Sequence, residues 1–298
     1  MARLTEIGGR RVPFLRWSVL RVLLGAGKLT GDGREEALLA YVTQRARAGD
    51  LDDVIRVIDE FCYERSFMIN VGDEKGELLD AAVRRAAPRL ILELGTYCGY
   101  SALRMARVMP AGARIVSIEL SPDHAEIARG IWRHAGIDDR ASVVVGMLSD
   151  GGATLDALEA EHGFGPKAVD FVFLDHGKDA YLPDLELLLE RGWLRPGTVV
   201  VADNVKHPGA PKYRAYMAER EGQTWRTAEH ATHVEYQSLL KDLVLESEYL
   251  GPRGGEHSPS ELRSPRPRQS GSPPRSASCR GSPQGAGVGC DGRFSPYR

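Results

Sequence analysis

The sequence predicts an α/β fold built on a mostly parallel sheet. Short apolar runs rich in β-branched residues occupy residues 90–94, 114–120, 142–146, 169–175 and 198–204. Their length and composition are typical of strands that are buried on both faces. Segments with apolar residues at helical spacing separate the runs, and strands that alternate with helices form a parallel sheet with helices on both faces.

Three helices are expected before the first strand, and three more helical patterns stand out between the strands. The first set occupies residues 34–48, 51–66 and 76–88, the last of which ends at Pro88. The second set occupies residues 101–110, 121–136 and 182–194. After the fifth strand, residues 224–237 and 242–250 have the pattern of two strands with no long helix between them. This pattern favours a hairpin-like end of the sheet.

Length, composition and charge fit an ordinary globular protein. The chain has 298 residues, of which 42% are hydrophobic and 27% are charged, and its formal net charge is −2. These values leave room for one domain or two. A net charge so near zero gives no support to a nucleic-acid-binding function. The four cysteines form no C-x-x-C pair, so we expect reduced thiols and a cytoplasmic location.

The N-terminal leader, residues 1–34, contains the stretch that comes closest to a membrane span, residues 10–27. Arg16 and Arg21 interrupt this stretch, so it falls short of the about 20 apolar residues that a membrane-spanning helix needs. One interpretation is a basic amphipathic helix in weak contact with a membrane surface. We favour the other, a short leader helix that packs on the domain or stays mobile.

The C-terminal tail differs in composition from the rest of the chain. Residues 252–298 hold almost no aliphatic side chains and are rich in Ser, Pro, Arg and Gly. Such a segment buries too little apolar area to offset its ordering entropy, so we expect it to be disordered. The domain that carries the chemistry is therefore predicted over residues 35–251.

The turn after the first strand has the composition of a ligand-binding loop. Glu93 stands near the strand end, and Gly95 and Gly99 precede a helix that begins near Ser101. Glycine permits a tight turn and lets backbone N–H groups approach a ligand closely. The dinucleotide fingerprint G-x-G-x-x-G is absent. A carboxylate at this position repels a diphosphate and attracts a cation such as a sulfonium.

The second and third strands end in further polar groups. Glu119 follows Gly99 by 20 residues, and an acid in this position can accept hydrogen bonds from both ribose hydroxyls. A nucleoside with a positive charge and no phosphates is S-adenosylmethionine. Ser149 and Asp150 are candidate neighbours of its adenine. A plain strand-to-helix turn would explain any one of these features, so the prediction rests on their combination.

Acidic residues also end the fourth and fifth strands. Asp175 ends the fourth, and Asp203 with Asn204 ends the fifth. If these strands are neighbours, the two carboxylates repel each other unless a cation joins them. Oxygen ligands from Asp and Asn suit a hard ion, and we predict Mg²⁺. The alternative is that these acids cap the following helices.

Lys178 stands three residues after Asp175. A lysine beside a dication and away from bulk water can act as general base on a hydroxyl that the metal has acidified. The alternative is a surface lysine that pairs with Asp179 or Asp184.

Six segments match a known family in order and spacing: "INVGDEKGELLDA", "LELGTYCGYSALRMAR", "VDFVFLDHGKDAYLPD", "GTVVVADNV", "HPGAP" and "VEYQ". Over about residues 37–251 the chain therefore resembles the catechol O-methyltransferase family. The resemblance implies a Rossmann-like class I methyltransferase. Its sheet would have seven strands, mostly parallel, with helices on both faces and an antiparallel last strand.

The resemblance also implies roles for individual residues. Asp175, Asp203 and Asn204 would hold Mg²⁺. The catalytic residues would be Lys178, as general base, and Glu235, as acceptor for the second hydroxyl of a catechol. The residues around S-adenosylmethionine would be Val71, Glu93, Gly95, Tyr97, Ser101, Glu119, Ser149 and His176.

The substrate slot that the resemblance implies departs from the family's well-known members. Pro208 would line the slot for the aromatic ring as it does in them. Gly177 and Phe67 stand where those members carry tryptophan, and Ile69 stands where they carry methionine. Loss of an aromatic gatekeeper at residue 177 widens the mouth of the pocket. We therefore expect a vicinal diol bulkier than dopamine-like catechols.

The predicted function is Mg²⁺-dependent transfer of a methyl group from S-adenosylmethionine to one hydroxyl of a small catechol-type molecule, by direct displacement. Two alternatives stay open. One is a methyltransferase for another vicinal-diol aromatic, such as a caffeoyl-type ester. The other is a non-catalytic binding protein on the same fold.

Overall fold

The computed structural model describes residues 5–7, 10–12 and 30–252. Within the leader, Thr5–Ile7 (β1) and Arg10–Val12 (β2) pair as a short antiparallel sheet. The rest of the predicted amphipathic segment and nearly all of the tail lie outside the described residues. The division into leader, domain and tail therefore stays a prediction.

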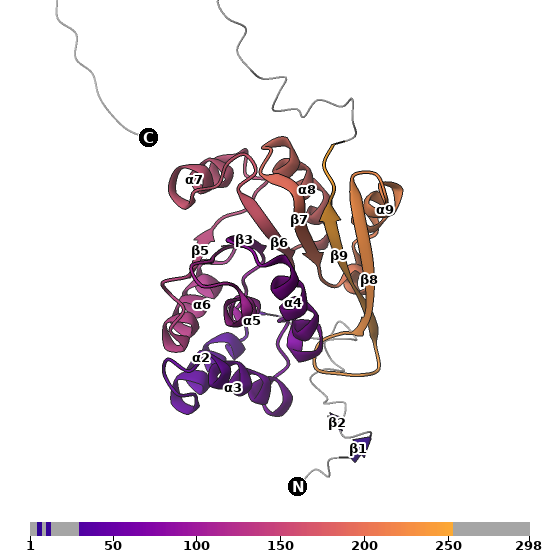
Figure 1. The fold of residues 1–298 in the computed structure, drawn as a ribbon. Coiled ribbons are helices and arrows are strands. Elements are labelled where there is room, and N and C mark those ends of the chain that lie inside the picture. Colours follow the sequence, from indigo (N-terminus) through magenta and orange to yellow (C-terminus); the bar gives the residue numbers. More distant parts are fainter. Residues whose placement is uncertain (1–4, 8–9, 13–29, 253–298) are drawn as a thin grey trace, which may run out of the picture. The chain divides into compact units, whose positions relative to one another are not determined.

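A seven-stranded sheet forms the centre of the domain (Figure 1). Its strands are β3 (Leu90–Leu94), β4 (Arg114–Glu119), β5 (Ala141–Val145), β6 (Val169–Leu174), β7 (Leu194–Ala202), β8 (Trp225–His233) and β9 (Lys241–Tyr249). They lie in the order β5-β4-β3-β6-β7-β9-β8. Strands β3 to β7 are mutually parallel, and β9 runs antiparallel to both β7 and β8. The predicted mostly parallel sheet with an antiparallel last strand is confirmed.

The central strands are buried on both faces, as their apolar sequences predict. Every residue of β3 and of β6 is buried. Because side chains alternate along a strand, Phe171 and Phe173 of β6 join one apolar cluster, whereas Val172 and Leu174 join the other. Each face of the sheet thus builds its own core.

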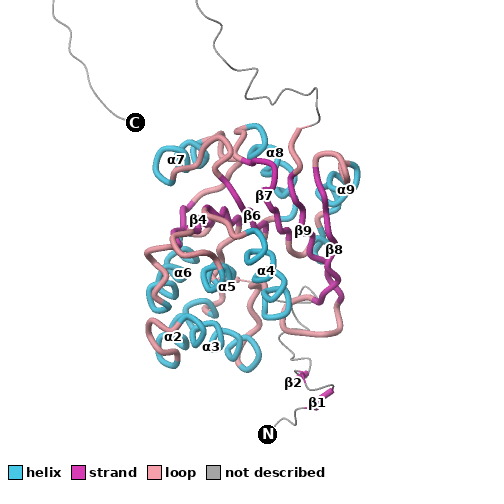
Figure 2. The backbone as a smooth tube through the Cα atoms, viewed as in Figure 1, coloured by secondary structure: helices cyan, strands magenta, loops and turns pink. Residues whose placement is uncertain are grey.

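Helices cover both of these faces (Figures 1 and 2). One core includes side chains of α2 (Arg34–Arg45), α3 (Leu51–Glu64), α4 (Gly72–Ala86), α5 (Tyr100–Val108) and α6 (Pro122–Ala135). The other includes side chains of α7 (Ala153–His162), α8 (Tyr181–Glu190) and α9 (Pro211–Glu219). The sequence patterns had not singled out α7 and α9. Among the described residues, no helix combines the length and apolarity that crossing a membrane requires.

Local sequence signals fix where the helices begin and end, as α6 illustrates. The Ser121 hydroxyl accepts a hydrogen bond from the His124 N–H at 3.3 Å, and Pro122 occupies the first turn. The helix ends at Gly136, whose φ of 73° is left-handed. The predicted segment, residues 121–136, therefore contains the helix together with both of its caps.

The Asp59 carboxylate ties α3 to two distant tyrosines. Tyr100 of α5 and Tyr236 of the loop after β8 both donate hydrogen bonds to its Oδ1 atom, at 2.7 and 3.0 Å. Burial raises the pKa of Asp59 from 3.8 to about 6. The protonated carboxyl is therefore more favoured in the folded protein than in the unfolded chain. The stability that protonated Asp59 contributes is fully present below pH 3.8 and is lost as the pH rises through about 6.

We expect Asp59→Asn to stabilise the protein at alkaline but not at acidic pH. Asparagine is neutral at every pH and keeps the Oδ1 acceptor for both tyrosines. The free energy of unfolding should rise by up to about 3 kcal/mol at pH 8 and change little near pH 4. Urea unfolding at the two pH values measures this. Asp52→Asn, which neutralises a 77% exposed carboxylate of the same helix, is the control. An equal effect of Asp59→Asn at both pH values would contradict the prediction.

Candidate active site

A cavity of about 780 Å³ opens at the carboxyl ends of the parallel strands. The predicted residues that line it are Val71, Gly95, Tyr97, Ser101, Glu119, Ser149, Asp175, His176, Lys178, Asn204, Pro208 and Glu235. Glu93 and Asp203, which the resemblance also assigned to the site, do not line the cavity, and both side chains are fully buried. The structure therefore brings residues from both predicted halves of the site to one cavity.

The Glu119 carboxylate organises the turn on which the predicted nucleoside would lie. It accepts hydrogen bonds from the backbone N–H groups of Tyr97 and Ser121, each at 2.8 Å. One N–H group engages each oxygen, so each oxygen keeps a lone pair for a further donor. The arrangement is compatible with ribose hydroxyls as those donors.

Two glycines of this turn are required by packing against neighbouring backbone and side chains. A Cβ atom on Gly95, whose φ is +98°, would lie 2.5 Å from the carbonyl oxygen of Asp175. A Cβ atom on Gly99, whose φ is +82°, would lie 2.4 Å from the Trp132 indole nitrogen. Gly95 thus allows the turn after β3 to rest directly on the end of β6. This contact joins the predicted cofactor half of the cavity to the predicted metal half.

Glu93 acts from behind the cavity wall. It accepts hydrogen bonds from the hydroxyls of Ser101 and Ser117. Burial raises its pKa to about 7. A positively charged ligand in the adjacent cavity would favour the ionised form of this carboxyl.

Asp150, which the sequence suggested as an adenine neighbour, serves a structural role instead. Its carboxylate accepts hydrogen bonds from the N–H groups of Gly152 and Thr154, at 3.1 and 2.9 Å. It therefore caps the start of α7 and does not line the cavity, whereas Ser149 does.

The His176 side chain is held in place by Asp184, a residue that the sequence analysis did not include in the cofactor site. Its Nε2 atom lies 2.9 Å from Asp184 Oδ2, and its ring stacks on Tyr181 with 5.0 Å between centroids. Its Nδ1 atom is buried with no hydrogen-bond partner. His176 and Asp184 both line the cavity, and the ion pair between them fixes the orientation of the imidazole ring there.

Strands β6 and β7 bring the predicted metal ligands together. Leu174 pairs with Ala202, and the Asp203 N–H donates to the Leu174 carbonyl at 3.0 Å. Asp175 and Asp203 therefore follow at neighbouring strand tips. The Asp175 carboxylate also contributes to raising the pKa of Asp203, although burial is the larger cause.

Lys178 stands at the start of a short 3₁₀ turn, Lys178–Ala180. Its ammonium donates to Asp175 Oδ1 at 2.9 Å and to the Tyr181 hydroxyl at 2.7 Å. It pairs with neither Asp179 nor Asp184, the partners expected of a plain surface lysine. Its side chain is 13% exposed and lines the cavity.

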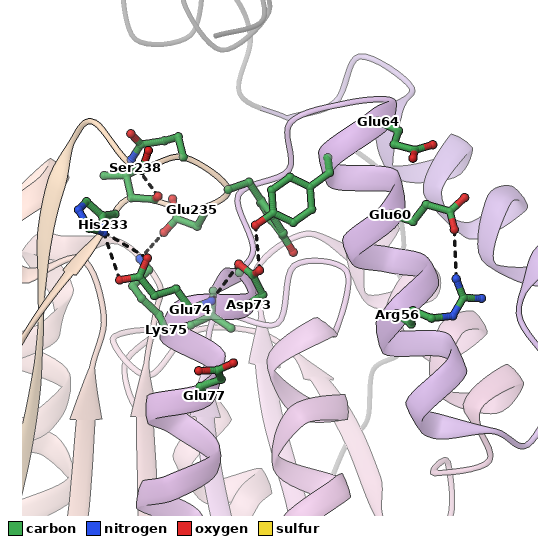
Figure 3. Close-up of a pocket in the computed structure, with 16 residues that line it drawn as sticks. Arg56, Glu60, Glu64, Asp73, Glu74, Lys75, Glu77, His233, Glu235 and Ser238 are labelled. Carbon is green, nitrogen blue, oxygen red and sulfur yellow. Dashed lines mark hydrogen bonds and ion pairs between the residues drawn. The ribbon is translucent and has the colours of Figure 1, made fainter. Parts of the chain in front are cut away.

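A second lysine, Lys75 of α4, lies among three carboxylates on the far side of Asp203. Its ammonium is 2.8 Å from Asp203 Oδ2 and 3.3 Å from Asp242 Oδ2, and it also contacts Glu235 Oε1 closely. Figure 3 shows Lys75 reaching from the start of α4 toward Glu235. The Asn204 amide completes the group, because its Nδ2 atom donates to Glu235 at 2.9 Å and to Asp242 at 2.8 Å.

The charges of this region fit a divalent cation. The four carboxylates of Asp175, Asp203, Glu235 and Asp242 face the two ammonium groups of Lys75 and Lys178, which gives a formal sum of −2. Burial, together with the neighbouring carboxylates, raises the pKa of Asp175, and that of Asp203 to about 7. One dication would relieve this repulsion, and Asn204 would add an uncharged oxygen ligand.

The sequence patterns missed Lys75 and Asp242. Lys75 does carry a signal, because it lies four residues before Leu79 on the stripe of α4 that is buried. A lysine on a buried stripe needs a carboxylate partner. Asp242 is the second residue of β9, and an acidic residue at the start of a strand is usually exposed to solvent. In the structure it is only 2% exposed.

Figure 3 shows the residues that line a second cavity, of about 650 Å³. Val71, Val234 and Glu235 line both cavities. The second cavity lies between α3, the start of α4 and the loop after β8, and its other acidic lining residues are Glu60, Glu64, Asp73, Glu74 and Glu77. Glu235 and Lys75 therefore form part of the wall between an acidic cleft and the candidate site.

The sheet order, the antiparallel last strand and the cavity at the strand ends define a Rossmann-like class I methyltransferase. Two solved structures share this fold. An O-methyltransferase from Bacillus cereus in complex with SAH has a TM-score of 0.51 at 24% identity, covering 78% of this chain and 98% of that one. TomG from Streptomyces achromogenes in complex with SAM has a TM-score of 0.52 at 24% identity, covering 79% and 97%.

Sequence comparison gives the family. A family model described as O-methyltransferase matches residues 48–223. A probable O-methyltransferase of Mycobacterium tuberculosis is 64% identical over 221 residues, which are 74% of this chain and 94% of that protein. Catechol O-methyltransferase of Mus musculus is 41% identical over 224 residues, 75% and 82% of the two chains. The chain belongs to the O-methyltransferase family, and its resemblance to catechol O-methyltransferases is confirmed.

Proposed function

We propose that this O-methyltransferase transfers a methyl group from S-adenosylmethionine to one hydroxyl of a catechol-type substrate, with Mg²⁺ as an obligatory cofactor. The observation that carries the proposal is the set of polar groups at one end of a single cavity. Asp175, Lys178, Asn204 and Glu235 all line it, and Asp203 lies directly behind. Acidic oxygen ligands, a half-buried lysine and a further carboxylate suit a substrate with two adjacent hydroxyls.

The roles of the residues follow from their chemistry. Asp175, Asp203 and Asn204 would hold Mg²⁺, which when bound supplies a fixed positive charge that acidifies and orients adjacent hydroxyls. Lys178 accepts the proton from the hydroxyl that is methylated. Glu235 accepts a hydrogen bond from the second hydroxyl and so fixes the orientation of the ring.

The cofactor half would hold the methyl donor by its charge and its ribose. S-adenosylmethionine supplies a methyl group on a positively charged sulfur, and the leaving group is a neutral thioether, so neither a covalent enzyme intermediate nor an acid catalyst is required. Glu119 would accept the ribose hydroxyls. Val71, Gly95, Tyr97, Ser101, Ser149 and His176 would form the walls of the cofactor half, and Glu93 would stabilise the cation from behind.

The proposal is tested by binding and turnover on the full chain. Calorimetry with S-adenosylmethionine should show one site per chain. Methyl transfer to 3,4-dihydroxybenzoate should require Mg²⁺ and should stop when a chelator is added. Binding without transfer to this or to a caffeoyl ester would identify a non-catalytic protein. Equal transfer with Mg²⁺ and with the chelator would refute the metal assignment.

The mouth of the cavity favours a bulky acceptor. Phe67, Ile69 and Gly177 all line the cavity. The backbone of Gly177 has φ −58° and ψ 119°, which any residue can adopt, and a Cβ atom built on it would meet nothing within 4 Å. The chain conformation therefore does not require glycine here, and its effect is to leave space at the mouth.

We expect Gly177→Trp to narrow the acceptor range. The added ring would occupy the open space at the mouth of the cavity. For a catechol with a large apolar substituent, kcat/KM should therefore fall by at least about tenfold, which corresponds to a loss of roughly 1.4 kcal/mol of transition-state stabilisation. The value for 3,4-dihydroxybenzoate should be unchanged or higher. Rates for both acceptors measure the effect. The control is Gly165→Trp, at a glycine that also has open space but lies outside the cavity. A clear wild-type preference for the smallest catechol would contradict the proposal.

A further inference from the structure

Lys75 is a buried cation whose three partners all come from other parts of the chain. Its side chain is 1% exposed. Asp203 follows β7, Glu235 lies in the loop after β8, and Asp242 lies in β9. The Lys75 ammonium forms ion pairs with all three carboxylates. A buried charge requires such partners, so Lys75 supplies the positive charge that these three carboxylates face.

The three carboxylates have the spacing of a metal site. One oxygen from each of Asp203, Glu235 and Asp242 lies within 4.8 Å of the others. Three carboxylate oxygens at such distances are typical of the ligands of a hard divalent cation. In this structure the Lys75 ammonium lies at that position, in contact with all three residues.

The charge sum gives the lysine a function. With Lys75 in place, the six charged groups of this region sum to −2, which matches one dication. Without the ammonium, the remaining five groups would sum to −3, and the three adjacent carboxylates would lose the cation that they share. A second divalent ion is the species that such a triad would attract.

We propose that Lys75 is a positioning residue whose ammonium takes the place of a second metal ion among Asp203, Glu235 and Asp242. It thereby limits the centre to one divalent cation and holds Asp203 and Glu235 in fixed positions beside the cavity. The inference rests on the metal site of the proposed function and deepens it. Lys75 does not line the first cavity, so it contacts neither cofactor nor substrate there.

The test counts metal ions bound to the full chain. Mn²⁺, a spectroscopic substitute for Mg²⁺, is titrated, and the free ion is followed by its electron paramagnetic resonance signal. The wild type should bind one Mn²⁺ per chain, and Lys75→Met should bind one more. Lys75→Met/Asp242→Asn removes one positive and one negative charge, so it should return to the wild-type count. Lys75→Arg, which keeps the charge, should also match the wild type. S-adenosylmethionine binding should be unchanged throughout.

Each outcome of the count decides the inference. An unchanged count and affinity in Lys75→Met would overturn it, as would two tightly bound ions in the wild type. If Lys75→Met is insoluble, recovery of folding by Mn²⁺ or by the Asp242→Asn change would support it. A wild type that binds no ion would refute the proposed metal site, yet the gain of one ion in Lys75→Met would still uphold the role of the lysine.

Discussion

Replacing Lys178 by alanine should lower turnover by about 10²–10⁴-fold, the range expected when a general base is lost. The Lys178 amine lies in the cavity beside Asp175 and Tyr181, at 2.9 and 2.7 Å, where it can act as the proton acceptor. The methyl side chain of alanine carries no basic nitrogen that could accept the hydroxyl proton in place of the lysine. Because Lys178 is not among the residues proposed to hold the cofactor, the dissociation constant of S-adenosylmethionine should change little.

Single-turnover methyl transfer and calorimetry on the same preparation separate these two effects. Lys212→Ala, which removes an exposed lysine of α9 outside the cavity, is the matched control and should retain full activity. Turnover of Lys178→Ala within a few-fold of the wild type would remove this residue from the mechanism. A parallel loss of cofactor binding would indicate damage to the fold rather than loss of a base.

Replacing Asp203 by asparagine should abolish metal-dependent turnover, with a loss of at least about 10³-fold, because several kcal/mol of metal-ion stabilisation would be lost. Asp203 is fully buried, and its Oδ2 atom makes an ion pair with Lys75 at 2.8 Å. The isosteric amide keeps the shape but removes one of the negative charges that a dication requires. The Lys75 ammonium would then also lack one of its partners.

Three measurements check this prediction. The residual rate should equal that of the wild type in chelator, Mn²⁺ binding should be lost, and the thermal midpoint should show that the variant is folded. Asp179→Asn removes the same charge from an exposed position four residues after Asp175 and should behave as the wild type. Metal-dependent turnover that persists in Asp203→Asn would rule out the assigned ligand set.

Local sequence patterns predicted the architecture and the sheet edge at which the candidate site lies. Buried apolar runs, helical spacing and glycine-containing turns act over a few residues, so they can be read without the fold. Asp175 and Asp203 could be placed together because parallel strands share one carboxyl edge. Glu235 had no such local signal, and only the family resemblance pointed to it. Residue spacing alone could not identify Glu235, because this residue lies in the loop between β8 and β9 and reaches the cavity only in the folded chain.

Only the tertiary structure decided which charges meet behind the cavity. Lys75 is 160 residues from Glu235 and 167 from Asp242 in the sequence, yet it contacts both. Gly95 likewise reveals its packing role only beside the Asp175 backbone. The sequence by itself thus determined the strands, most of the helices and the edge of the sheet at which acidic residues gather. Which cation pairs with each of these acidic residues depended on contacts between distant segments. Ion pairs form between residues that are close in space, and they produce no regular pattern in the sequence.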